Sequence, residues 1–178
     1  VCAGGTIDVD PVSGYASYPG SEHVAIPDLG TTLPDWYSVS TNGGLCLVGP
    51  VALTNAALTP SNGVAYVQGD IVLSGACTLQ GILVAEGSIV IRGGLDVQSL
   101  PAHPDWPILI AAVDLDDDQP NVYTGTVFAG SNVWYTNRRL IQQRIISTGT
   151  ITISNAAVSA TTSAPVAVPY AWLDGHYP

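Results

Sequence analysis

The sequence has almost no positive charge. It contains no lysine and only four arginines, against fourteen aspartate and glutamate residues, so its formal net charge at pH 7 is −10. A protein that binds nucleic acid needs a basic surface that displaces counterions from the phosphates. Nucleic acid is therefore excluded as a partner.

Long apolar runs and metal-binding cysteine spacings are also missing. No stretch approaches the ~20 apolar residues of a membrane-spanning helix, so we expect no membrane span in this chain. The three cysteines include no C-x-x-C pair, so a zinc or iron–sulfur site has no support. The chain starts at Val1 without the charged segment of a signal peptide, and we expect it to be a processed or excised part.

What the sequence does contain is a glycine at every sixth position between residues 63 and 93. The third and fifth positions of each six-residue unit are apolar, and the sixth is polar. Residues two apart on an extended segment face the same side, so the apolar positions face inward, and glycine permits the backbone to bend. The expected inward residues are Ala65, Val67, Ile71, Leu73, Cys77, Leu79, Leu83, Ala85, Ile89, Ile91, Leu95 and Val97.

Each unit therefore predicts one short strand and one bend, and three units close a triangular rung of about 18 residues that stacks on the next at ~4.8 Å. We expect an all-β fold, a parallel β-helix or β-solenoid. Left-handed hexapeptide helices carry a branched aliphatic residue directly before the small residue. Polar or charged residues hold that place here, which favours a right-handed helix: Gln68, Ser74, Gln80, Glu86 and Arg92.

The same pattern predicts the organisation of the chain. Residues 43–160 form the solenoid, with an irregular insertion at 99–124 where prolines interrupt the repeat. Because the end of a solenoid exposes unpaired backbone, residues 1–42 are expected to form an irregular N-terminal lead-in or cap over that end. Residues 161–178 are expected to be a tail that packs on the solenoid or on a neighbouring subunit.

The cysteines lead to two predictions. Cys77 lies at an inward position, where a free thiol acts as a small apolar side chain. Cys46 lies at an outward position and Cys2 lies in a glycine-rich start. Either these two cysteines form a disulfide that pins the N-terminal segment to the first rung, or both remain free.

One acidic stretch is the single candidate for a ligand site. Asp114, Asp116 and Asp118 alternate along the chain directly after an apolar run. Their oxygens can converge on a calcium ion, because ligands two residues apart share a loop in known calcium sites. The alternative is a solvated acidic turn, and no other cofactor is expected.

Catalytic signatures are absent. There is no G-x-S-x-G sequence, and the histidines His23, His103 and His176 all lie in irregular segments. The chain is therefore not expected to be an enzyme. Side chains that we expect instead to contact other subunits are Trp134, Arg138, Arg139, Arg144 and Trp172.

Five segments in this order carry a family resemblance: IPDLGTTLPDWY, GVAYVQGDIVLSGACTLQGILVAEGSIVIRGGLDVQ, WPILIAAVDL, GTVFAGSNVWY and RIISTGTITISNAAV. Over residues 24–160 the chain resembles the C-terminal β-helical domain of PilX-like, pilus-associated surface proteins and, more loosely, the bactofilins. The resemblance implies a right-handed β-helix displayed outside the cell, with a structural or adhesive role.

Two functions follow as expectations. The first is a non-enzymatic, extracellular structural protein, a building block or accessory subunit of a cell-surface filament, pilus or sheath, whose partners are copies of itself or other filament subunits. The second is a carbohydrate-binding or polysaccharide-cleaving β-helix, in which exposed aromatic rings stack on sugars.

Overall fold

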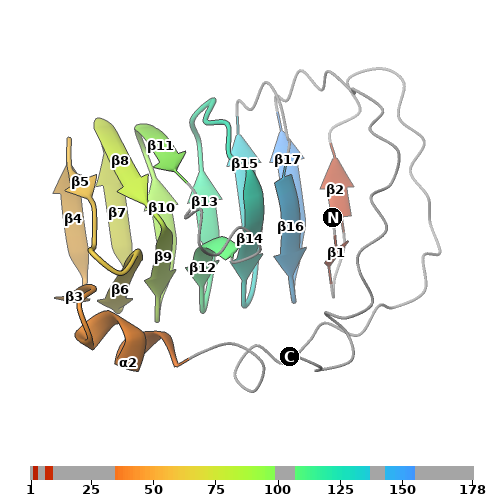
Figure 1. Cartoon of the computed structure of the whole chain (residues 1–178). Coiled ribbons are helices and arrows are strands. Elements are labelled where there is room, and N and C mark those ends of the chain that lie inside the picture. The colour runs from red at the N-terminus through yellow and green to blue at the C-terminus, as the bar shows by residue number, and fades with distance from the viewer. Residues whose placement is uncertain (1, 4–6, 10–34, 99–106, 137–142, 155–178) are drawn as a thin grey trace.

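The computed structural model describes residues 2–3, 7–9, 35–98, 107–136 and 143–154. These residues form a β-solenoid with three parallel sheets and one short helix, α2 (Trp36–Thr41) (Figure 1). Sheet A has the strand order β1 (Cys2–Ala3), β16 (Gln143–Ser147), β14 (Gly125–Ala129), β12 (Pro107–Ala111), β9 (Ile82–Ala85), β6 (Val64–Gln68) and β3 (Leu45–Val48).

The other two sheets form the remaining sides. Sheet B has the order β2 (Ile7–Val9), β17 (Ile151–Ser154), β15 (Val133–Thr136), β13 (Leu115–Asp117), β10 (Ile89–Ile91), β7 (Ile71–Ser74) and β4 (Val51–Thr54). Sheet C is shorter, with the order β11 (Gly94–Gln98), β8 (Ala76–Gln80) and β5 (Ala57–Leu58). From β3 to β11 the chain visits sheets A, B and C in turn, and from β12 to β17 its described strands alternate between sheets A and B. The predicted parallel β-helix is confirmed.

The spacing between stacked residues also agrees with the prediction. Partners in sheet A are 18 residues apart at Ala65 and Leu83, and again from Leu109 to Val127 and on to Ile145. Leu83 and Leu109 are 26 residues apart, eight more than in these regular coils. The insertion predicted at 99–124 is therefore narrower, because β12 and β13 lie inside that range and pair within sheets A and B.

The core is a column of aliphatic side chains enclosed by the three sheets. All twelve residues that the repeat predicts to face inward pack in this column, eleven of them at most 4% exposed and Val97 half-buried. Parallel stacking places side chains of the same row on one another, so every coil buries the core residues of the coil beneath it.

Glycine is required at the corners for two different reasons. Gly63, Gly69, Gly75 and Gly81 have positive φ angles, which residues with a Cβ rarely adopt. Gly93 has no such angle, but a Cβ at this position would lie 2.1 Å from the carbonyl oxygen of Gly75 in the coil below. Close stacking of coils therefore demands glycine even where the backbone conformation does not.

Side-chain oxygens bond to the corner backbone at the start of several sheet B strands. Asp70 Oδ1 accepts a hydrogen bond of 2.7 Å from the backbone N–H of Ser88, one coil further on. Asp114 Oδ1 accepts from the N–H of Asn132 at 2.9 Å, and Asn132 Oδ1 accepts from the N–H of Thr150 at 3.0 Å. Each side chain thereby satisfies a corner N–H of the following coil, a role that Asx side chains commonly have in turns.

The N-terminal residues lie at an unexpected place. β1 and β2 pair in parallel with β16 and β17, so the first residues of the chain add a last coil at the end opposite to β3 and β4 (Figure 1). The expectation that residues 1–42 cap the first rung is therefore wrong for residues 2–3 and 7–9. Residues 10–34 and the tail at 161–178 lie outside the described residues.

The predicted disulfide between Cys2 and Cys46 is wrong for a single chain. β1 and β3 are the two opposite edges of sheet A, separated by five strands. Six strand spacings of ~4.8 Å place the two Cα atoms about 29 Å apart, whereas a disulfide needs less than ~7 Å. Cys46 is accordingly a free, exposed thiol, and Cys77 is a free, buried one as predicted.

Helix α2 lies on the outer face of sheet A, not across the end of the solenoid. Its N-cap is Asp35, which accepts hydrogen bonds from the Ser38 hydroxyl at 2.7 Å and the Ser38 backbone N–H at 3.2 Å. These bonds favour the ionised carboxylate and hold the pKa of Asp35 below its usual value. The helix begins here because Asp35 satisfies one of the free N–H groups of its first turn.

Two adjacent glycines test the stacking argument. Gly93→Ala should lower the free energy of unfolding by about 2–3 kcal/mol, because the added methyl group meets the Gly75 carbonyl. Gly94→Ala is the matched control and should change it by less than about 1 kcal/mol, since no atom lies within 4 Å of its Cβ position. Urea unfolding followed by circular dichroism measures both, and equal effects of the two variants would contradict the argument.

Candidate functional site

The acidic stretch does not converge on one point. Asp116 Oδ2 lies 2.5 Å from Arg92 Nη2, and Asp118 Oδ2 lies 3.5 Å from Arg92 Nε. Asp114 is instead bonded to the backbone and side-chain nitrogens of Asn132. Within the described ranges, no group of three or more His, Cys, Asp and Glu side chains is arranged to hold a metal ion.

Asp117, between these residues, has the opposite environment. It is fully buried on the inner face of β13, where its Oδ2 accepts a hydrogen bond of 2.8 Å from the hydroxyl of Tyr123. Its Oδ1 accepts from the backbone N–H of Gln119 at 3.0 Å and from Asn121 Nδ2 at 3.1 Å. Asn121 in turn accepts a bond from the N–H of Leu95 in the coil below.

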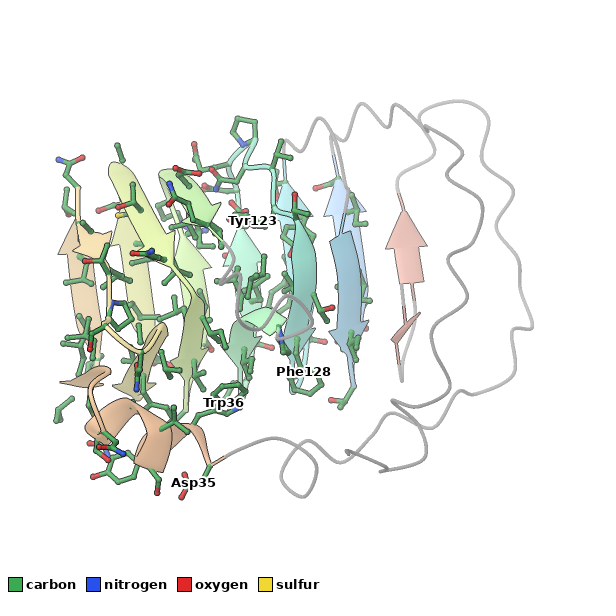
Figure 2. The ribbon with its side chains drawn as sticks, in the orientation of Figure 1. Asp35, Trp36, Tyr123 and Phe128 are labelled. Atoms are coloured by element: carbon green, nitrogen blue, oxygen red, sulfur yellow. The ribbon has the colours of Figure 1, made fainter. Side chains whose placement is uncertain are left out.

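Within the described residues sheet C ends at β11, and this network fills the core beyond it. Asn121 takes the place of the next strand above Leu95, and Tyr123 fills the core beside it (Figure 2). A buried carboxylate is tolerated only when hydrogen bonds compensate for its lost hydration. Asp117 is therefore a structural residue of the core.

The predicted contact residues are only partly described. Trp134 is 36% exposed on the outer face of sheet B, in register with Asp116 on one side and Thr152 on the other. Arg144 lies in β16 opposite Thr126, and its side chain is outside the described residues, as are Arg138, Arg139 and Trp172. Trp134 thus faces solvent as predicted.

The outer face of sheet A was missed by the sequence reasoning. Several of its residues point away from the core and are nevertheless buried in a second apolar cluster with Trp36 of α2 (Figure 2). The six-residue units at 63–68 and 81–86 carry apolar residues at their second and fourth positions as well, a continuous run that is typical of strands buried on both faces. The members are Trp36, Val64, Tyr66, Ile82, Val84, Ile110 and Phe128.

Tyr66 joins this outer cluster to the helix. Its ring meets that of Tyr37 edge to face, with centroids 5.6 Å apart, and its hydroxyl donates a hydrogen bond of 2.7 Å to Glu86. Burial, together with that bond and the charge of Glu86, raises the pKa of Tyr66 well above its usual value. The hydroxyl therefore stays protonated and remains a donor.

The end of the solenoid at β3, β4 and β5 is the main candidate surface. These strands are the edges of their sheets, so one side of each has no paired strand in the described part of the chain. Leu45, Leu47, Val51 and Leu53 in this first coil are only partly buried. Their partners in the next coil, Ala65, Val67, Ile71 and Leu73, are at most 1% exposed.

This open end lacks one feature that normally limits association between sheet edges, which is charge. Edge strands in soluble proteins are usually protected by charged residues, lysine above all. Residues 43–62, which form the first coil, include no charged residue at all. The end therefore combines unpaired backbone, partly exposed leucine and valine side chains, and no electrostatic repulsion.

No protein-family model, no curated protein and no solved structure matches this chain. The resemblance to PilX-like surface proteins and to bactofilins therefore remains a prediction. The described ranges contain one helix, α2, which is six residues long. Among these residues, no helix is long and apolar enough to span a membrane.

The role of Asp117 is testable by stability. Asp117→Ala should lower the free energy of unfolding by about 2–4 kcal/mol, because it removes a buried acceptor from Tyr123 and Asn121. Asp96→Ala, which removes an exposed carboxylate from β11, is the control and should stay within about 0.5 kcal/mol. If Asp117→Ala changes the free energy of unfolding only slightly in chemical denaturation, the buried network does not stabilise the side of the coil beyond β11.

Proposed function

We propose that the protein is a non-enzymatic structural protein that assembles end to end into a filament or sheath at the cell surface. The observation that carries the proposal is the uncharged open end formed by β3, β4 and β5. A second copy is the partner that fits it, because the far end of the solenoid is formed by β1 and β2, the opposite edges of the same two sheets.

Geometry supports a head-to-tail arrangement. All described strand pairs in sheets A and B are parallel, so a copy placed coaxially in the same orientation continues both sheets. Such a contact joins two different surfaces and does not close on itself, which produces an open filament. Filament subunits need no catalytic group, in agreement with an acidic stretch that is engaged in structural contacts.

The carbohydrate-binding alternative rests on Trp134, whose exposed ring can stack on a sugar. The other residues of its row on sheet B are not aromatic: Ala52, Val72, Val90, Asp116, Thr152 and Asp8. A platform of several rings is therefore not present in this row. A glycan array with the wild type and with Trp134→Ala separates this alternative from assembly.

Backbone hydrogen bonding identifies a substitution that blocks the open end. Val51 and Asn55 donate their N–H groups to Asp70 and Ser74 in the next coil. Donors alternate along a parallel strand, so the N–H of Ala52 points to the open edge. Proline at an edge position of this kind removes a donor without breaking a bond inside the sheet.

Ala52→Pro should therefore shift the protein from multimers or filaments to monomers. The protein concentration at which half of the chains are assembled should rise by at least about tenfold. Light scattering after size exclusion and negative-stain electron microscopy measure this. Ala52→Ser, which keeps the N–H group, is the matched control and should assemble like the wild type.

Circular dichroism confirms that each variant is folded before its assembly is compared. A folded Ala52→Pro variant with unchanged assembly would rule out this end as the contact surface. A wild type that stays strictly monomeric at every concentration tested would refute the proposed function.

A further inference from the structure

The two edge strands of sheet A each carry a cysteine in the same register row. The pairs along the sheet connect Cys46, at the β3 edge, with Cys2, at the β1 edge, through one residue per strand. The complete row, called here the cysteine row, is Cys46, Tyr66, Val84, Ile110, Phe128, Ile146 and Cys2.

We infer that copies of the chain join head to tail in the register that continues this row, and that Cys46 of one copy forms a disulfide with Cys2 of the next. The inference rests on the proposed function, and it adds the register of the joint and a covalent lock. Cys46 is available for this role because it is exposed and free.

Distance supports the disulfide across the joint. Within one chain the two cysteines are at opposite ends of seven strands. In a stack, they become neighbours on adjacent parallel strands, whose Cα atoms lie ~4.8 Å apart. Disulfides require Cα separations of about 4.4–6.8 Å. Two stacked copies meet this requirement, whereas the two cysteines of a single chain are too far apart.

Sheet B continues in the same register. At its two edges, Val51 and Ile7 end one row, and Leu53 and Val9 end another. All four of these residues are aliphatic, like most of the other residues in the two rows. A joint that aligns the cysteine row therefore also aligns apolar rows of sheet B.

The chemistry requires an oxidant. Two thiols lose two protons and two electrons as the S–S bond forms, and a small disulfide such as oxidised glutathione takes them up and becomes two thiols. The first thiolate displaces one glutathione, and the second thiolate then displaces the other from the mixed disulfide.

Two complementary variants test the register. Cys46→Ser retains Cys2, and Cys2→Ser retains Cys46, so only a mixture of the two can form the predicted link between chains. After incubation with oxidised glutathione, the mixture should give about tenfold more covalent dimer on a non-reducing gel than either variant alone, because the joint raises the local thiol concentration. The wild type, which has both cysteines, should form a ladder of longer covalent multimers.

Light scattering of the same proteins in dithiothreitol separates this inference from the proposed function. Multimers in dithiothreitol without a covalent dimer in the oxidised mixture would overturn the register and the lock, and leave end-to-end assembly standing. Monomers under both conditions would overturn both proposals.

Two further outcomes count against the inference. Covalent dimers of Cys2→Ser alone would show that two β3 edges meet head to head. A wild type that loses the Cys2 and Cys46 thiols without gaining the mass of glutathione, and yet remains a single chain on the gel, would show that these two cysteines join within one chain.

Discussion

The ladder of backbone hydrogen bonds between parallel coils is the constraint on which the rest of this structure depends. It fixes the coil separation at ~4.8 Å, so that each side chain lies directly over its counterpart in the coil below. Core rows, glycine corners and the Asp70, Asp114 and Asn132 corner bonds all repeat because the backbone repeats. The same ladder cannot close on itself, so it leaves an edge at each end.

Stacking also gives neighbouring residues of the same type different structural roles. The four aspartates between 114 and 118 have three different environments: a corner bond, an ion pair with Arg92 and a fully buried network. A local cluster of acidic residues was the reason to consider calcium. Alternation in β13 turns Asp117 into the core and Asp116 outward to Arg92, whereas Asp114 lies at the corner before the strand and is bonded to Asn132.

Much of the fold could be predicted because its period is local. Ile71, Leu83 and Ile89 are fully buried as the six-residue pattern requires, and the two extra residues Ser61 and Asn62 account for the 20-residue step between Leu45 and Ala65. The helix at Trp36 and the buried outer face of sheet A were missed. The signal for the buried outer face is the pair of apolar runs at 64–67 and 82–85, which were interpreted for their inward residues alone.

The sequence by itself determined the rung, its corners and its apolar column, because these depend on residues six and eighteen positions apart along one chain. Only the tertiary structure decided where the first residues lie, since pairing of β1 with β16 joins Cys2 and Ile146, 144 positions apart, and has no periodic signal. The candidate site follows the same division. The sequence alone shows that the first coil is uncharged. The stacking order of the strands decides that this coil forms an edge, and that Cys2 lies at the opposite edge in the row of Cys46.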